Sequence, residues 1–266
     1  MTDIYVACEV SGNIATVTLT NPPLNVFKVE MTGQLDAILE SLRDNDSVRG
    51  VVLKGAGKAF CAGSDIAEFK DYYQPGRVVD LKLRRQNAVF QKLDSFPKPV
   101  VAAIHGLAFG GGLEIAMCCD LIVAEEDSRF ALPEMRLGVF PSSGGPFRTV
   151  RRIGEGRTKQ LIFLTDPVSA PTALQWGLID RIARNGEVFE VATKLAAEMA
   201  KRPPTAFSLC KALIDDATHL SLPELISRSL EASDKAFSSA ECREGVRAFF
   251  AKEEPQFGRT LSPSEE

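Results

Sequence analysis

The chain has 266 residues, of which 45% are hydrophobic and 25% charged, and its formal net charge at pH 7 is −4. A chain of this size and composition can bury a full hydrophobic core, which excludes intrinsic disorder. Its acidic balance, without a dense block of Lys and Arg, lacks the positive field expected of a nucleic-acid-binding protein.

The first predicted element is a β-hairpin. Alternating apolar residues over 14–20 predict a half-buried strand, and residues 4–10 pair with it through the turn Ser11-Gly12-Asn13. Apolar residues at helical spacing then predict a helix over 31–42, and the short apolar segment 50–54 predicts a buried strand. The chain therefore begins with strands and then enters a rhythm of alternating helix and strand.

This rhythm continues through the middle of the chain. We expect a helix over 79–93, a strand over 99–104, a helix from about residue 111 and a strand over 121–124. Strands that alternate with helices are joined by crossovers, so the sheet should be largely parallel and covered on both faces. The fold class is therefore α/β.

Strands disappear in the last quarter of the chain. Apolar residues recur at helical spacing over 188–199 and 207–214, and no alternating pattern follows them. We therefore expect a core that contains the active site, residues 1–195, and a C-terminal helical segment, residues 196–266, that packs on the core or on a neighbouring subunit. The polar tail from Gly258 is expected to fray.

The sequence predicts neither a membrane span nor a signal peptide. The apolar stretch 99–119 is long enough to raise the question of a span, but it contains His105, Glu114 and four glycines, which favours a buried core. The N-terminus has no basic stretch before an apolar one. The six cysteines form no CxxC pair and only two histidines are present, which excludes a zinc site and indicates reduced thiols in the cytoplasm.

Three common catalytic patterns are absent. Residues 54–58 resemble half of a P-loop, but Val52 replaces its first glycine and Ala59 its magnesium-binding hydroxyl. Phe60 stands where a dinucleotide-binding GxGxxG motif requires its third glycine. No GxSxG motif of a serine hydrolase occurs, and His105, at the end of an apolar strand, is typical of a structural histidine.

Two loops of small residues are stronger candidates. Residues 60–65 (FCAGSD) and 109–114 (FGGGLE) each lead from a strand into a helix. The first N–H groups of a helix lack partners, so two such loops can form an oxyanion hole that stabilises negative charge on an oxygen. The alternative is that these glycines only permit close packing.

Two carboxylates favour the catalytic interpretation. Glu114 follows the glycines among apolar residues, and Glu134 follows a proline that can begin a helical turn. Burial would raise their pKa values toward neutrality, which suits proton transfer. The alternative for Glu134 is an acid that stabilises a helix N-terminus. The spacing of twenty residues does not show whether the two acids meet.

Taken together, these motifs resemble the crotonase superfamily, and specifically its enoyl-CoA hydratase/isomerase family. The similarity runs through most of the chain, and its motifs occur in the order that the family has. The segments that carry it are 57–66, 104–114, 119–124, 130–138 with Pro141 and Gly144-Gly145 after it, and 244–249.

The resemblance implies a spiral of repeated ββα units whose C-terminal helices form a homotrimer, commonly paired into a homohexamer. The substrate would be an acyl-CoA thioester, its carbonyl oxygen bound by the backbone N–H groups of Ser64 and Gly111. Ala62, Asp65 and Ile66, with Ser64, match the segment that binds the substrate and its CoA moiety. Coenzyme A enters as part of the substrate, so neither a separate cofactor nor a metal is expected.

By the same resemblance, Glu114 and Glu134 match the two glutamates that hydratases place around a water. We expect Glu114 to activate this water, which adds across the 2,3-double bond, and Glu134 to deliver a proton to C2. Double-bond isomerases use the second acid alone, so both acids together favour hydration. Isomerisation or another crotonase reaction, and a non-catalytic CoA-binding oligomer, remain the alternatives.

Two residues depart from the family pattern. Ser64 replaces a common alanine, which adds a hydroxyl beside an intact amide. Ser142 replaces a glycine of the family, and if that glycine has a positive φ, serine would strain or displace the loop.

Overall fold

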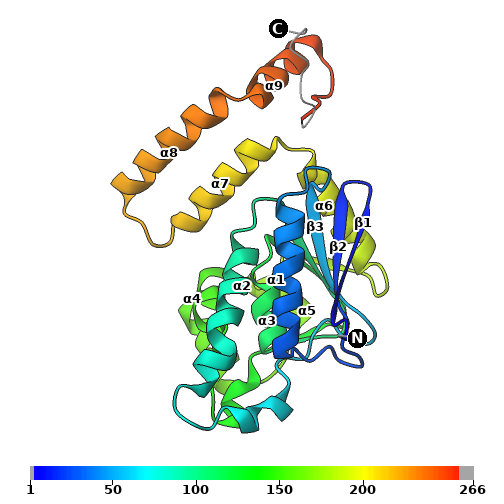
Figure 1. Ribbon diagram of the computed structural model, residues 1–266, viewed down its shortest axis with the longest axis vertical. Helices are drawn as coiled ribbons and strands as arrows, with labels where there is room; N and C mark the ends of the chain where they lie inside the picture. Colours follow the sequence, from blue (N-terminus) through cyan, green and yellow to red (C-terminus); the bar gives the residue numbers. More distant parts are fainter. Residues whose placement is uncertain (1–2, 258–266) are drawn as a thin grey trace.

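A six-stranded sheet with helices on both faces forms the core of the computed structural model, which describes residues 3–257 (Figure 1). The strands follow the order β1-β2-β3-β4-β6-β9, in which β1 and β2 are antiparallel and all other neighbours are parallel. Their bounds are Val6–Ser11 (β1), Ile14–Leu19 (β2), Gly50–Gly55 (β3), Val100–Ile104 (β4), Leu121–Glu125 (β6) and Arg181–Ala183 (β9). The predicted hairpin and largely parallel sheet are confirmed, whereas the tail from Gly258 lies outside the described residues.

Side chains of the central strands alternate between two hydrophobic clusters. Val51 and Leu53 of β3 pack in the larger cluster with α1 (Val29–Arg43) and α2 (Arg84–Asp94). Val52, which lies between them, packs in the second cluster under α6 (Val188–Ala200). Successive residues of a strand point to opposite faces, and here both faces are covered. This explains why these strands are almost wholly apolar.

A smaller three-stranded sheet positions the two candidate acids. It contains β5 (Leu107–Phe109), β7 (Arg129–Ala131) and β8 (Val168–Ser169), with β5 and β7 parallel. Helix α3 (Gly111–Ala116) follows β5, and the 3-10 helix η3 (Pro133–Leu137) follows β7. Because parallel strands end at the same edge of a sheet, α3 and η3 begin side by side.

The remaining elements connect these layers. The 3-10 helix η1 (Ile66–Asp71) follows β3, and the predicted helix over 79–93 consists of the π-helical turn η2 (Val79–Leu83) and α2. Two further helices, α4 (Gly145–Leu164) and α5 (Ala170–Trp176), complete the region before β9. Among residues 3–257, the helices are all too short or too polar to cross a lipid bilayer.

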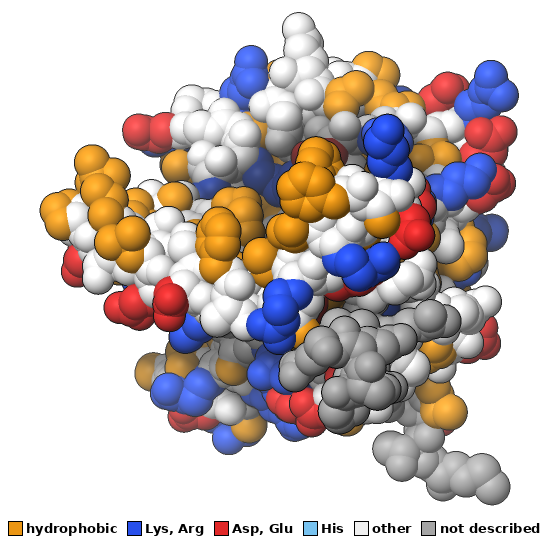
Figure 2. Space-filling model, turned by 90° about the horizontal axis from the view of Figure 1, so that it is seen from above, with side chains coloured by type: hydrophobic (Ala, Val, Ile, Leu, Met, Phe, Trp, Pro, Cys, Tyr) orange, Lys and Arg blue, Asp and Glu red, His pale blue; other side chains and the backbone are white. Residues whose placement is uncertain are grey.

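Three C-terminal helices extend from this core (Figure 1). They are α7 (Pro204–Asp216), α8 (Leu222–Phe237) and α9 (Ala240–Ala251). The expected boundary at residue 195 falls inside α6, which packs on the sheet as far as Ala200. Neither α7 nor α8 contains a buried residue. Figure 2 looks down on the C-terminal helices and shows hydrophobic side chains gathered on their exposed surface.

Candidate active site

Glu114 is held firmly inside the protein. It lies on α3, where its side chain is only 3% exposed. Gly112 allows α3 to approach the loop after β3, since a Cβ there would lie 2.2 Å from the carbonyl oxygen of Cys61. Glu114 Oε1 accepts hydrogen bonds from the backbone N–H groups of Ser143 and Gly145, both at 2.8 Å. Burial raises the pKa of Glu114 to about 7, although these two hydrogen bonds oppose the shift.

Glu134 is half-buried and less restrained than Glu114. Pro133 begins η3, and Glu134 Oε1 lies against Gly110, where a Cβ would come within 2.6 Å of it. Gly110 has a φ of 50°, a conformation that favours glycine. Within residues 3–257, Glu134 Oε2 is buried without a hydrogen-bond partner. Burial first, and then the negative charge of Glu114, raise the pKa of Glu134 to about 8.

These environments give two chemically identical side chains different tendencies to ionise. Glu114 ionises first because two N–H groups stabilise its carboxylate. Its charge then makes ionisation of Glu134 harder. Near neutral pH the pair therefore holds about one proton, and Glu134 is its preferred position. Such a pair offers a base and an acid at the same time.

The two predicted amide donors lie on neighbouring loops. Cys61 N–H donates to Leu107 O, and Phe109 N–H donates to Cys61 O, each at 3.0 Å. A Cβ on Gly111 would lie 3.7 Å from Ser64 N, so the two residues are close. In the described part of the chain, neither the Ser64 nor the Gly111 N–H donates a hydrogen bond to a protein group. Both amides are therefore available to a ligand.

The other predicted binding residues surround Ser64. The Ala62 N–H is occupied by Leu24 O, at 2.9 Å. The Asp65 carboxylate accepts a hydrogen bond from the Ala67 N–H at 3.0 Å and caps η1, which is a structural use of this side chain. Ile66 is 57% exposed, which is unusual for an isoleucine and leaves its apolar side chain accessible.

Sequence reasoning missed the residues that position Glu114. Ser143 and Gly145 supply the two N–H groups. The run of small residues after Pro141 was the feature of the sequence that could have indicated this role. The strain expected at Ser142 is absent, because among residues 3–257 positive φ outside glycine occurs only at Asn25, Thr165 and Lys252.

Gln86 was also missed. It is fully buried on α2, and among residues 3–257 neither polar atom of its side chain has a partner. Its burial could have been predicted from its position, since it shares helical spacing with the buried Val89, Phe90 and Leu93.

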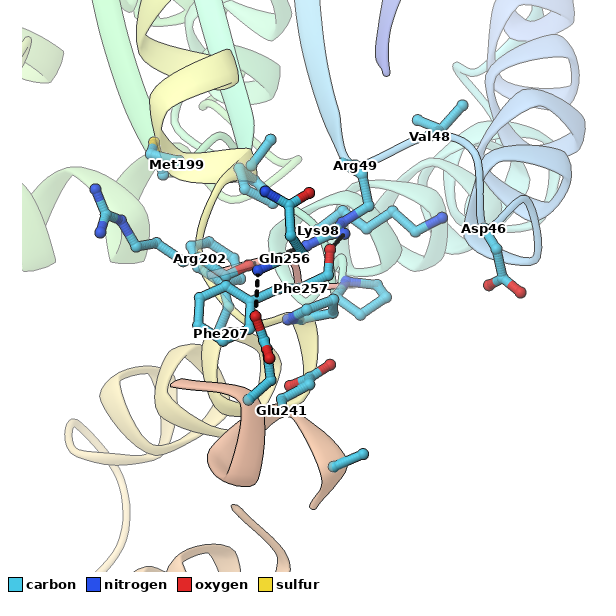
Figure 3. A pocket seen from close by; sticks show the side chains of 16 residues that line it. Asp46, Val48, Arg49, Lys98, Met199, Arg202, Phe207, Glu241, Gln256 and Phe257 are labelled. Atoms are coloured by element: carbon cyan, nitrogen blue, oxygen red, sulfur yellow. Dashed lines mark hydrogen bonds between the residues drawn. The ribbon is translucent and has the colours of Figure 1, made fainter. Parts of the chain in front are cut away.

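A cavity of about 430 Å³ lies at the opposite end of the sheet (Figure 3). It is lined by residues that precede β3 and β4, including Arg49 and Lys98, and by residues of α7 and α9, including Phe207 and Glu241. Arg49 donates a hydrogen bond to the carbonyl oxygen of Phe257 at 2.9 Å. This cavity is therefore where the C-terminal segment meets the core, and neither candidate acid lines it. Within residues 3–257, no group of three His, Cys, Asp or Glu side chains could hold a metal ion.

Comparison with known proteins shows similarity over nearly the whole chain. The model of the enoyl-CoA hydratase/isomerase family matches residues 9–260. The short-chain-enoyl-CoA hydratase of Clostridium acetobutylicum is 34% identical and is aligned over 93% of this chain and 95% of its own. The 1,2-epoxyphenylacetyl-CoA isomerase of Escherichia coli is 32% identical, over 95% and 98%. The solved structure of Pseudomonas aeruginosa DspI superposes with a TM-score of 0.91 at 33% identity, covering 97% of this chain and 98% of the other.

Proposed function

Since the chain belongs to the enoyl-CoA hydratase/isomerase family, we propose that it is an enoyl-CoA hydratase, a lyase that adds water across the 2,3-double bond of an enoyl-CoA thioester. One observation carries the proposal. Two glutamates with raised pKa values, Glu114 buried and Glu134 half-buried, lie beside two backbone N–H groups that have no partner among the described residues. Hydration needs a base, an acid and a means of stabilising an oxyanion, and this arrangement can supply all three.

The proposed reaction uses each group once. Ionised Glu114 accepts a proton from water as the water oxygen attacks C3. The electron pair of the double bond moves toward the thioester, whose oxygen gains negative charge as an enolate. The N–H groups of Ser64 and Gly111 stabilise that charge, each donor being worth about 2.7–4 kcal/mol in such sites. Protonated Glu134 then delivers its proton to C2, and return of the proton from Glu114 to Glu134 restores the starting state.

This assignment of roles follows from the pKa values. The pKa of about 7 at Glu114 leaves a large ionised fraction near neutral pH, as a base requires. The pKa of about 8 at Glu134 keeps that carboxyl largely protonated, as an acid requires. In this scheme the protein needs no metal or separate cofactor, and coenzyme A is part of the substrate.

Double-bond isomerisation is the second candidate. The Escherichia coli relative, at 32% identity, is named as an isomerase, so similar overall identity occurs with both reactions. An isomerase needs one base to move a proton between carbons, and Glu134 alone can serve. Glu114 favours hydration, because its carboxylate would then have a function that isomerisation does not require.

A panel of saturated and unsaturated acyl-CoA esters, analysed by mass, tests the proposal. Crotonyl-CoA should gain the mass of one water, whereas an isomer would keep its mass and change its retention. Glu114→Gln should abolish the gain of water but leave isomerisation largely intact. Tight CoA binding without turnover of any ester would instead support the non-catalytic oligomer and end the hydratase proposal.

We also propose that the protein is a homotrimer, alone or paired into a hexamer. An apolar stripe along α8 supports this, because large exposed patches of this kind mark interfaces. The residues of this α8 stripe are 53–77% exposed and comprise Leu222, Ile226, Leu230 and Phe237. Sedimentation should show a trimer or hexamer, and Leu230→Asp should dissociate it. A monomeric wild-type protein would contradict the assembly.

A cytoplasmic location belongs to the same proposal. It is supported by the six cysteines, which form no disulfide in the structure, as expected of a reducing compartment. Fractionation of cells that make the tagged protein tests this location, and recovery outside the cytoplasm would contradict it.

A further inference from the structure

The Gln86 side chain is an unexplained polar group beside the site. It is fully buried, and among residues 3–257 neither Oε1 nor Nε2 has a hydrogen-bond partner. A buried polar group without a partner destabilises a protein, because it has lost its hydrogen bonds to water without replacing them. The next residue, Asn87, shows that α2 can satisfy an amide, because Asn87 Nδ2 donates to Leu83 O and Ser142 O. Gln86 therefore departs from the rule that buried amides are hydrogen-bonded, and a bound ligand could supply the missing partner.

The position of Gln86 indicates which atom that ligand would present. The space that a Cβ of Gly111 would occupy has three nearest neighbours outside its own helix backbone. They are Ser64 Oγ at 3.6 Å, Ser64 N at 3.7 Å and Gln86 Nε2 at 3.9 Å. All three can donate a hydrogen bond, and they lie beside the Gly111 backbone, whose N–H is a further donor. Donors that gather in this way favour a ligand oxygen that carries negative charge.

From this arrangement we propose that Gln86 Nε2 donates a further hydrogen bond to the thioester oxygen of the substrate, beside the N–H groups of Ser64 and Gly111. The inference rests on the proposed function, since that function places the same oxygen beside the N–H groups of Ser64 and Gly111. A carboxamide donor carries no charge of its own, so it binds an enolate oxygen without ionising. The bond strengthens as the oxygen becomes negative, which lowers the barrier more than it tightens substrate binding.

Gln86→Met is the variant that tests this donor. Methionine has nearly the same shape but donates no hydrogen bond, and it removes both unpartnered groups. The variant should therefore melt at the same temperature as the wild type or higher, whereas a residue with only a structural role would lower the melting temperature when replaced. The kcat for crotonyl-CoA should fall about 10²–10³-fold, the usual effect of losing one oxyanion donor, with a much smaller change in KM. Gln91→Met makes the same chemical change at an exposed position of α2 and should have no effect.

A second measurement reports on the thioester oxygen directly. The infrared carbonyl stretch of butyryl-CoA labelled with ¹³C at C1 moves to lower frequency as donors bind its oxygen. This saturated ester cannot be hydrated, so the measurement does not depend on turnover. Binding to the wild type and to Gln91→Met should give the same downward shift, and Gln86→Met should give a smaller one.

The outcomes separate this inference from the proposed function. An unchanged carbonyl shift and an unchanged kcat in Gln86→Met would overturn the role of Gln86 while leaving hydration intact. A reduced shift in a protein that does not hydrate crotonyl-CoA would keep the role of Gln86 and reject the hydratase. A loss of activity confined to acyl chains with a hydroxyl or carbonyl substituent would move the contact of Gln86 to the acyl chain and overturn the inference.

Discussion

The regions around α3 and η3 each present one glutamate, but they restrain it differently. Glu114 on α3 has an oxygen fixed by two N–H donors at 2.8 Å. Glu134 on η3 has an oxygen without a partner among residues 3–257, and its carboxyl faces Gly110. The difference shows how a protein obtains a base and an acid from two residues of the same type. It stabilises the ionised form of one glutamate, so that the other glutamate holds the proton.

Removing either carboxyl should have the largest effect on this pair. Glu134→Gln should lower kcat for hydration of crotonyl-CoA by about 10²–10⁴-fold, because C2 loses its proton donor. Adding Glu114→Gln should cost much less than a second factor of this size, because a variant that cannot protonate C2 gains little from the base that activates the water. Steady-state kinetics of the two single variants and the double variant measure this. Fully multiplicative losses would show that the two glutamates contribute independently and would contradict their action as a pair.

Alanine substitutions should expose the difference in restraint. Glu114→Ala leaves the N–H groups of Ser143 and Gly145 buried without their acceptor, so we expect a loss of about 2–4 kcal/mol of unfolding free energy. Glu134→Ala removes an oxygen that has no partner in the described part of the chain, and it should cost less than about 1 kcal/mol. Urea unfolding of both variants compares them, with Glu114→Gln as the control that retains an acceptor. Equal losses would contradict the assignment of α3 as the more restrained region.

The dependence of the hydration rate on pH should distinguish the base Glu114 from the acid Glu134. The reaction needs Glu114 ionised and Glu134 protonated, so kcat/KM should follow a bell-shaped curve. The acidic limb should reflect the pKa of about 7 at Glu114 and the basic limb the pKa of about 8 at Glu134. Outside these limbs the rate should change about tenfold per pH unit. A flat profile between pH 5 and pH 10 would reject this pair as the acid and the base.

Stability should also depend on pH through the two carboxyls. Both have pKa values in the folded protein above the ordinary value of 4.5, so the folded state binds protons more tightly than the unfolded state. Their contribution to stability is thus complete below about pH 4.5 and is lost as pH rises through about 7 and 8. Replacing Glu134 with Gln should reduce this loss by an amount on the order of 4 kcal/mol between pH 5 and pH 9. Equal pH slopes of unfolding free energy in both proteins would argue against a raised pKa.

Periodicity and local motifs were sufficient to predict much of the fold. Alternation over residues 14–20 predicted β2, and the short apolar run from residue 50 predicted β3, because buried strands have few alternatives to apolar side chains. The same logic marked Glu114 as unusual, since an acid among apolar residues is rare. The core was expected to end at residue 195, although the apolar spacing over 188–199 predicted the helix that continues to Ala200.

Contacts between distant segments could not be predicted in this way. The approach of Glu134 to Glu114 depends on the parallel pairing of β5 with β7, in the register Phe109 opposite Ala131. The same limitation applied to three residues for which no motif indicated a role. Ser143 and Gly145 bind Glu114 through backbone N–H groups, which every non-proline residue has, and Gln86 is distinctive only because its environment provides no partner.

The smallest expected effect concerns the loop that restrains Glu114. Ser142→Gly restores the residue common in the family, and we expect less than about a threefold change in kcat and less than about 0.5 kcal/mol in stability. Ser142 has no positive φ to relieve, and its Oγ donates only to Phe140 O, at 2.8 Å. Its carbonyl oxygen, which accepts from Asn87 Nδ2 at 3.1 Å, is kept in the variant. Kinetics and urea unfolding of Ser142→Gly measure both quantities. A large gain in rate would mean that the loop, and with it the restraint on Glu114, differs between serine and glycine, so the contrast between α3 and η3 would then depend on residue 142.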